Sequence, residues 1–203
     1  MKKLLWICFF LTLGFSQTWE RILPCYVNNV YYAGAYSGGV NYSRPDWVDI
    51  DNDGDYDLMI GAEHGGMHFY RNIGTASSPS WLFVTEFYEN IDIENRCSQA
   101  FVDIDNDNDY DILIGEQDGN INFYRNVGSP TNDTFVLVTE NYNGINVGSF
   151  SAPVCCDIDA DGDYDLFIGE HYGNLNYYRN DGTASTPAWT FVTETWFSID
   201  VGT

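Results

Sequence analysis

The sequence predicts an all-β fold built from repeated units of four antiparallel strands. Three observations support this. The chain aligns with itself at a spacing of 54 residues, and short runs of β-branched and aromatic residues alternate with clusters of Gly, Asn and Asp. In addition, no window shows a sustained apolar period of 3.6 residues, which disfavours helices. Each unit is therefore expected to consist of strands joined by turns.

The repeat is clearest in an acidic segment that occurs three times without a gap, beginning at Asp49, Asp103 and Asp157. Five of the nine residues in each copy are aspartates. The register continues downstream, where glycines and two kinds of triplet recur. The triplets are Tyr70-Arg71-Asn72, Tyr124-Arg125-Asn126 and Tyr178-Arg179-Asn180, then Val84-Thr85-Glu86, Val138-Thr139-Glu140 and Val192-Thr193-Glu194. Matches of this length indicate three copies of one structural unit.

The first unit shows how strands and turns alternate. Its expected strands are 46–50, 58–62, 67–71 and 81–86. They are joined by the acidic segment, by a turn at 63–66 and by a loop at 72–80 that contains Gly74 and Pro79. Four antiparallel strands in a repeat of this length are typical of a β-propeller blade. A repeated hairpin of a β-sandwich is the alternative architecture.

The repeat divides the chain into segments. The expected segments are a signal peptide at 1–16, an N-terminal strand and lead-in at 17–44, and blades at 45–98, 99–152 and 153–203. Three blades make an incomplete propeller, so we expect a fragment from which further blades or domains are missing. Residues 19–23 are similar to the last strand of a blade and could close a ring. A closed assembly of two or more copies is the alternative to a fragment.

The N-terminus has the pattern of a secretory signal peptide. Lys2 and Lys3 precede an apolar stretch at 4–15, and Gly14-Phe15-Ser16 forms a small-x-small cleavage site, so we expect cleavage after Ser16. The apolar stretch is too short to span a bilayer, and no other segment is long and apolar enough. A buried N-terminal strand is the alternative. The chain is therefore expected to be secreted, in the extracellular space or at the cell surface, with no membrane insertion.

Charge and cysteine content narrow the partners further. The 203 residues include 30 acidic and 8 basic side chains, for a net charge of −22, which repels nucleic acid and anionic lipid and attracts cations. Four cysteines remain after the signal peptide, and they allow three disulfide pairings or free thiols. They are Cys25, Cys97, Cys155 and Cys156. No CxxC pair occurs, which disfavours a zinc site.

The acidic segments predict about three calcium sites. Calcium takes six to eight oxygen ligands, and a tight loop with aspartates at alternate positions can turn them toward one centre. Side-chain ligands are expected from positions 1, 3, 5 and 9 of each loop, and a main-chain carbonyl from position 7. The side-chain ligands are Asp49, Asp51, Asp53 and Asp57; Asp103, Asp105, Asp107 and Asp111; and Asp157, Asp159, Asp161 and Asp165. The carbonyl donors are Asp55, Asp109 and Asp163.

Position 6 must turn sharply, and Gly54, Asn108 and Gly162 suit a positive φ there. A solvated run of charge is the alternative, but five carboxylates between apolar strands are costly without a cation. Magnesium is a weaker candidate because it prefers rigid octahedral geometry and retained water. An EF-hand is excluded because position 12, which needs glutamate, is isoleucine. The glycine-rich nonapeptide of calcium-binding β-rolls is also missing.

Two segments of the third unit resemble the FG-GAP and VCBS-type repeats, the family of the integrin alpha-subunit β-propeller. They are residues 157–169, Asp-Ile-Asp-Ala-Asp-Gly-Asp-Tyr-Asp-Leu-Phe-Ile-Gly, and residues 173–180. The similarity extends over residues 45–202. It implies calcium between the first two strands of each blade and ligand recognition on the opposite face. Family propellers usually have about seven blades. Bacterial secreted members often serve as adhesion or carbohydrate-binding parts of larger proteins.

Recognition residues are expected away from the acidic loops. The candidates are His64, Asp118 and Tyr172 in the turns between second and third strands, and Tyr88, Tyr142 and Trp196 in the connections between blades. Aromatic platforms suit sugar rings or protein contacts. Packing between neighbouring blades is the alternative role. The recurring Arg71, Arg125 and Arg179 are expected to pair with carboxylates or carbonyls within their own blades.

These patterns predict a secreted calcium-binding repeat protein that acts in cell adhesion or binds an extracellular protein or glycan. No nucleophile motif occurs, and catalytic acids rarely occur in triplicate, so an enzyme is not expected. A carbohydrate-binding module or part of a polysaccharide-active extracellular enzyme is one alternative. A structural spacer in a large surface protein is another.

Overall fold

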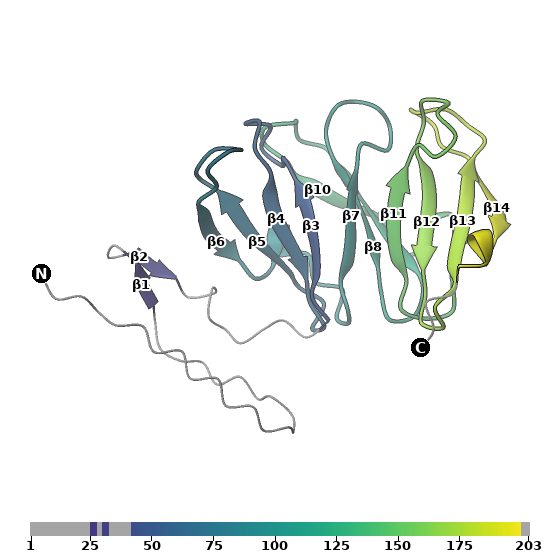
Figure 1. Cartoon of the computed structure of the whole chain (residues 1–203), viewed down its shortest axis with the longest axis horizontal. Helices are drawn as coiled ribbons and strands as arrows, with labels where there is room; N and C mark the ends of the chain where they lie inside the picture. Colours follow the sequence, from purple (N-terminus) through teal and green to yellow (C-terminus); the bar gives the residue numbers. More distant parts are fainter. Residues whose placement is uncertain (1–24, 28–29, 33–41, 200–203) are drawn as a thin grey trace, which may run out of the picture.

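The structure is a computed structural model that describes residues 25–27, 30–32 and 42–199 (Figure 1). Within this part, three four-stranded antiparallel sheets follow a two-stranded pairing of β1 (Cys25–Val27) with β2 (Val30–Tyr32). The expected signal peptide at 1–16 and the expected strand at 19–23 lie outside the described residues.

Each sheet is a meander whose strands pair in chain order. The first contains β3 (Arg44–Val48), β4 (Asp57–Gly61), β5 (Met67–Asn72) and β6 (Trp81–Thr85). The second contains β7 (Ser98–Val102), β8 (Asp111–Gly115), β9 (Ile121–Asn126) and β10 (Phe135–Thr139). The third contains β11 (Ala152–Cys156), β12 (Asp165–Gly169), β13 (Leu175–Asn180) and β14 (Trp189–Thr193). The all-β fold with four antiparallel strands per repeat is thus confirmed, and the sheets resemble propeller blades. None of them closes on itself within the described part.

Strand register repeats between the sheets. Trp47 lies opposite Leu58, Phe101 opposite Ile112, and Cys155 opposite Leu166. The first strand differs most from its expected bounds, because β3 runs from 44 to 48 and not from 46 to 50. Asp49 leaves the strand because its carboxylate accepts hydrogen bonds from the loop that follows. Each sheet begins one residue before the expected blade boundary.

A short 3₁₀ turn follows each sheet, at η1 (Tyr88–Asn90), η2 (Tyr142–Gly144) and η3 (Trp196–Ser198). Periodicity could not reveal these turns, since each is one turn long. Its middle residue has φ near 50° in all three copies. The turns lie in the connections that leave the fourth strand, at the end of the sheets opposite the acidic loops (Figure 1).

The hydrophobic core lies between the sheets. Met59, Met67 and Phe69 of the first sheet pack against Ile112 and Ile114 of β8 in the first cluster. Leu113, between those two isoleucines, faces the other way and packs with residues of the third sheet. The second sheet is therefore buried on both faces, which explains why β8 reads as a continuous apolar run. Full burial of each such side chain contributes about 1.5–3 kcal/mol.

The first strands of neighbouring sheets contact one another, β3 with β7 and β7 with β11 (Figure 1). This contact explains one recurring glycine. A Cβ atom at Gly61 would collide with the carbonyl of Cys97, and one at Gly115 with the carbonyl of Ser151. At Gly169 the nearest atom to such a Cβ is Ala152 Cβ, at 3.8 Å. The glycine therefore permits the next sheet to approach closely.

Candidate metal centres

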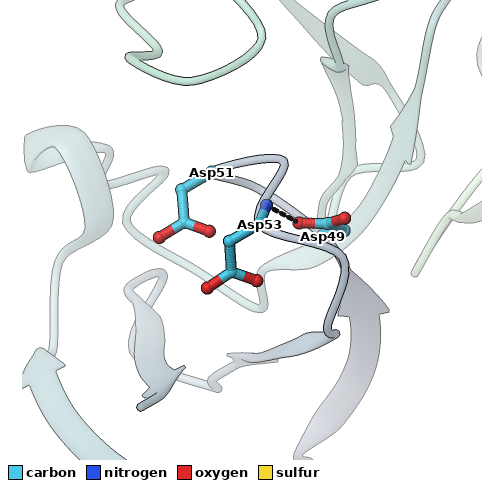
Figure 2. Close-up of side chains that lie close together, drawn as sticks. All are labelled: Asp49, Asp51 and Asp53. Atoms are coloured by element: carbon cyan, nitrogen blue, oxygen red, sulfur yellow. Dashed lines mark hydrogen bonds between the residues drawn. The ribbon is translucent and has the colours of Figure 1, made fainter. Parts of the chain in front are cut away.

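Each acidic loop gathers three carboxylates at one point. The aspartates at positions 1, 3 and 5 place one oxygen each within 4.8 Å of one another. The three groups are Asp49, Asp51 and Asp53; Asp103, Asp105 and Asp107; and Asp157, Asp159 and Asp161. Figure 2 shows the first group, whose side chains extend from the loop between β3 and β4. Three of the four expected side-chain ligands thus meet in every loop.

The loop is held in this shape by its own carboxylates. In the first copy, Asp49 accepts hydrogen bonds from the backbone N–H groups of Asp53 and Gly54, both at 3.0 Å. The carboxylate of Asp53 accepts from the N–H of Asp55 at 3.0 Å. The other two loops repeat all three bonds at 3.0–3.2 Å. The aspartates at positions 1 and 5 therefore shape the backbone while keeping further lone pairs available.

The backbone angles explain which residues are allowed at two positions of the loop. Position 6 has φ of 92° at Gly54, 74° at Asn108 and 94° at Gly162, which confirms the expected positive φ. Position 4 was not anticipated, although it also lies in the left-handed region. Its φ is 54° at Asn52, 59° at Asn106 and 61° at Ala160. Asparagine tolerates this region better than other residues with a side chain. The asparagines at position 4 of the first two loops were therefore a sign in the sequence of the left-handed conformation.

The aspartate at position 9 lies apart from the cluster of three. Asp57, Asp111 and Asp165 begin the second strand of their sheets and are buried. One oxygen of each accepts a backbone N–H from the third strand, at 2.7–2.8 Å. The other oxygen of Asp57 and of Asp111 is buried without a hydrogen-bond partner among the described residues, whereas that of Asp165 accepts from the Tyr177 hydroxyl.

Position 7, whose main-chain carbonyl is the expected donor, also places its side chain close to the loop. The side chains of Asp55 and Asp109 are buried, at 8% and 7% exposure. One carboxylate oxygen of each, and one of Asp163, has no hydrogen-bond partner among the described residues. Each loop thus gathers three carboxylates at one point, and its aspartates at positions 7 and 9 add buried oxygens, some of which lack a partner among the described residues.

Residues 103–168 match the family model described as FG-GAP-like repeat, which runs from the second acidic loop through the rest of its sheet, β11 and the third acidic loop into β12. This part of the chain is similar to FG-GAP-like repeats. A search of curated proteins found no match to the chain. FG-GAP repeats occur in extracellular proteins and are typical of propeller-like domains that act in adhesion and ligand binding. Among the described residues, no helix is long and apolar enough to cross a membrane.

Burial and mutual repulsion raise the pKa values of several loop carboxyls. Burial raises the pKa of Asp57 to about 6 and that of Asp111 to about 7. Burial, followed by the charge of Asp107, raises the pKa of Asp109 to about 6. A divalent cation would offset both costs. The unpartnered oxygens and the all-oxygen donor set fit calcium, with the side chains at positions 1, 3 and 5 as the ligands already gathered.

The recurring arginine of the FG-GAP repeat contacts a carboxylate in its own blade, as expected. Arg71 pairs with Asp51 at 3.5 Å and Arg125 with Asp105 at 3.2 Å, both at position 3 of the loop. Arg179 pairs instead with Asp181 at 2.7 Å, where the other copies have Ile73 and Val127. The third loop therefore lacks the ion pair that partly balances charge in the first two.

The recurring asparagine of the triplet has a role that the sequence pattern did not reveal. Asn72 is buried, its N–H donates to Asp57, and its side-chain oxygen accepts from the N–H groups of Gly74 and Ser80. Asn126 and Asn180 repeat these bonds. The asparagine joins the loop aspartate at position 9 to the turn between third and fourth strands. The recurrence of this asparagine in all three units was the sign of this role in the sequence.

The expected recognition residues divide into buried and exposed groups. Tyr88 and Tyr142 lie between blades at 5% and 8% exposure, which corrects their expected place on an open surface. The Tyr88 hydroxyl donates to Asp133, and the Tyr142 hydroxyl accepts from Trp189 Nε1 at 3.0 Å. Trp196, at the same repeat position, is half-buried against Tyr177 and Phe167. Packing between blades is therefore the role of the two tyrosines.

The turn residues remain accessible. His64, Asp118 and Tyr172 are exposed, at the ends of the sheets opposite the acidic loops. Cys97, Cys155 and Cys156 are free thiols, and burial raises the pKa of Cys97 and of Cys155 to about 12. Such thiols are protonated and unreactive at neutral pH.

Proposed function

We propose that this chain is a secreted binding or adhesion protein in which each FG-GAP repeat holds one structural calcium ion. The observation that carries the proposal is the same in all three copies. Three loop carboxylates meet within 4.8 Å, beside buried carboxylate oxygens that have no protein partner among the described residues. A cation between like charges placed this close would offset their mutual repulsion.

Calcium suits the loop better than magnesium does. Every donor is an oxygen, several are carboxylates, and the loop backbone supplies further carbonyls, which is the ligand set of a flexible site with six to eight oxygens. Magnesium keeps several waters and needs near-octahedral geometry, whereas these loops crowd five aspartates into nine residues.

The ion would act on the fold and not on a substrate. Asp57 already connects the loop to β5 through the N–H of Asn72, and Asn72 in turn holds the turn before β6. A cation bound by the loop would therefore fix the first three strands of the blade at one end. The turns at the opposite end, with exposed His64, Asp118 and Tyr172, are left for contact with a protein or glycan.

Secretion is supported by Lys2, Lys3 and the apolar stretch that follows them. The three arginines near the acidic loops are engaged in ion pairs, and the large negative net charge disfavours nucleic acid. We propose no catalysis by this segment, because the triplicated aspartates are engaged in shaping the loops.

Calcium removal tests the proposal. We expect isothermal titration calorimetry to give about three calcium ions per chain, and differential scanning fluorimetry to show a large fall in melting temperature in excess chelator. One site held at a hundredfold its dissociation constant contributes about 2.7 kcal/mol to stability. A matched pair of variants distinguishes binding by the loop from a general effect of negative charge. Asp105→Asn should remove one calcium site, whereas Asp118→Asn, at the opposite end of the sheet, should leave all three.

An unchanged melting curve in chelator would contradict a structural ion. The binding role is tested separately with calcium-saturated protein on glycan and extracellular protein arrays, where retention of a ligand without turnover is expected. Product release from a polysaccharide would instead identify part of an enzyme, and retention of nothing would identify a spacer.

A further inference from the structure

A second repeated position lies at the end of the sheets opposite the acidic loops. Tyr42, Arg96 and Phe150 are spaced by 54 residues, just before the first strand of each sheet. All three adopt the left-handed region, with φ of 53°, 54° and 54°. Residues with large side chains rarely do so, and the conformation costs about 1–2 kcal/mol each. The same strained turn thus directs one side chain from each blade.

These three side chains form a stack. The guanidinium carbon of Arg96 lies 3.8 Å from the centre of the Tyr42 ring and 3.9 Å from the centre of the Phe150 ring. Both faces of the guanidinium are covered by aromatic rings, which suits its planar shape and weak hydration. Within the described part of the chain, its N–H groups form no hydrogen bond or ion pair.

A second arginine lies at the same place. Arg44 and Arg96 line one cavity of about 440 Å³, together with Phe150, Glu170 and His171. Burial and then the charge of Arg96 lower the pKa of Arg44, so two like charges are held near each other. Neither guanidinium pairs with a carboxylate among the described residues, whereas Arg71, Arg125 and Arg179 each do.

The acid that lines this cavity, Glu170, forms no ion pair with either arginine among the described residues. The Glu170 carboxylate accepts hydrogen bonds from the backbone N–H groups of Tyr172 and Asn174, at 2.7 and 3.2 Å, and from the Asn174 side chain at 2.6 Å. It is thus occupied with its own turn. In a chain of net charge −22, two arginines without a carboxylate partner in one cavity form a local site for an anion.

We propose that this cavity binds the carboxylate of an acidic sugar, a uronate, through Arg44 and Arg96. The guanidinium edge matches a carboxylate with two parallel hydrogen bonds. The cavity volume falls within the roughly 300–1,000 Å³ of small-molecule sites. Phe150 and His171 present aromatic surface for the apolar face of a sugar ring, and Asn174 offers polar groups for its hydroxyls.

A compact cavity favours a sugar over an acidic peptide. An extended peptide binds along a sheet edge or a long groove, with regular main-chain hydrogen bonds. Here the walls are short turns and the ends of several strands, and both arginines line the same cavity. This inference rests on the proposed extracellular binding function and specifies the class of ligand and the residues that recognise it.

The test measures binding of D-galacturonate and D-glucuronate to calcium-saturated protein by ¹H–¹⁵N chemical-shift titration. D-galactose and D-glucose are the uncharged counterparts, and a glutamate-rich peptide is a carboxylate source that is not a sugar. We expect the uronates to bind at least tenfold more tightly than either comparison. Arg44→Gln and Arg96→Gln should each weaken uronate binding at least tenfold, and Arg179→Gln, whose partner is Asp181, should not change it.

Melting curves and calcium stoichiometry are recorded for every variant, because Arg96→Gln also removes a stacked group. Arg44 begins β3 and is not a member of the aromatic stack, so Arg44→Gln keeps the test decisive if Arg96→Gln does not fold. Equal binding of neutral sugars, tighter binding of the peptide, or unchanged uronate binding in Arg44→Gln would overturn the uronate site. If the uronate site is overturned, the proposed function still holds when the protein binds three calcium ions and retains a ligand on the glycan or protein arrays.

Discussion

At the scale of single residues, Ala160 is the exception in a turn that otherwise uses asparagine. Position 4 of the acidic loop is left-handed in all three copies, and only the third has alanine there. Asparagine tolerates this conformation because its short polar side chain bonds locally. We expect Ala160→Asn to raise the free energy of unfolding by about 0.5–1 kcal/mol, measured by denaturant titration in saturating calcium.

The reciprocal change provides the control. Asn106→Ala, at the same position in the second loop, should lower stability by a similar amount. If both substitutions are neutral, the left-handed turn is not a source of strain in the folded protein.

Residue-level prediction from the sequence succeeded where chemistry restricts the choice to one or two residue types. Positive φ at position 6 followed from Gly54, Gly162 and Asn108. The role of Asn72 could not be inferred, because its buried hydrogen bonds join segments that only the folded sheet brings together. The stack of Tyr42, Arg96 and Phe150 was missed for a different reason. Its three members share a backbone conformation but differ in side chain, so the amino-acid sequence does not show that this position repeats.

At the scale of the element, the acidic loop should make the stability of the calcium-free protein fall as pH rises, while the stabilisation that calcium adds should increase. The folded-state pKa values of about 6 for Asp57 and about 7 for Asp111 lie above the ordinary value of 3.8. A raised carboxyl pKa means that the folded chain binds more protons than the unfolded chain does. The calcium-free protein therefore loses stability as pH rises from about 4 through about 7.

Calcium requires the ionised carboxylates, so the stabilisation that it provides should be larger at pH 8 than at pH 5. We expect melting temperatures in chelator to be higher at pH 5 than at pH 8, and the shift caused by added calcium to increase over the same range. Asp111→Asn removes the group with the highest of these pKa values and should flatten the pH dependence in chelator. A melting temperature in chelator that rises with pH would contradict this assignment.

The strands and loops of each unit could be predicted from the sequence because three aligned copies define the same boundaries. The burial of the residues that connect the sheets could not be predicted from the sequence, because it depends on whether a neighbouring sheet covers them. Tyr88 and Tyr142 lie between sheets, whereas Trp196 has no further sheet beside it among the described residues. Equivalent residues in a repeat therefore share a backbone position without sharing an environment.

At the scale of the whole molecule, this difference makes the second sheet the one that is covered by a neighbouring sheet on both faces within the described array. Ile60 and Ile114 occupy the same repeat position on the second strands of their sheets. Ile114 is fully buried between the first and second sheets, whereas Ile60 is only half-buried on the opposite face of the first sheet. The contribution of one residue type at one repeat position should therefore depend on its place in the array.

Alanine substitution at the two positions measures this dependence. We expect Ile114→Ala to cost about 2–5 kcal/mol of unfolding free energy, because it creates a cavity in a core that sheets cover on both sides. Ile60→Ala should cost about 1 kcal/mol, since its surroundings are partly open and can relax. Both values come from denaturant unfolding at saturating calcium, with calcium stoichiometry as the check that the loops remain intact. Equal losses at the two positions would mean that the face of the first sheet bearing Ile60 is covered in solution as completely as the interface between blades.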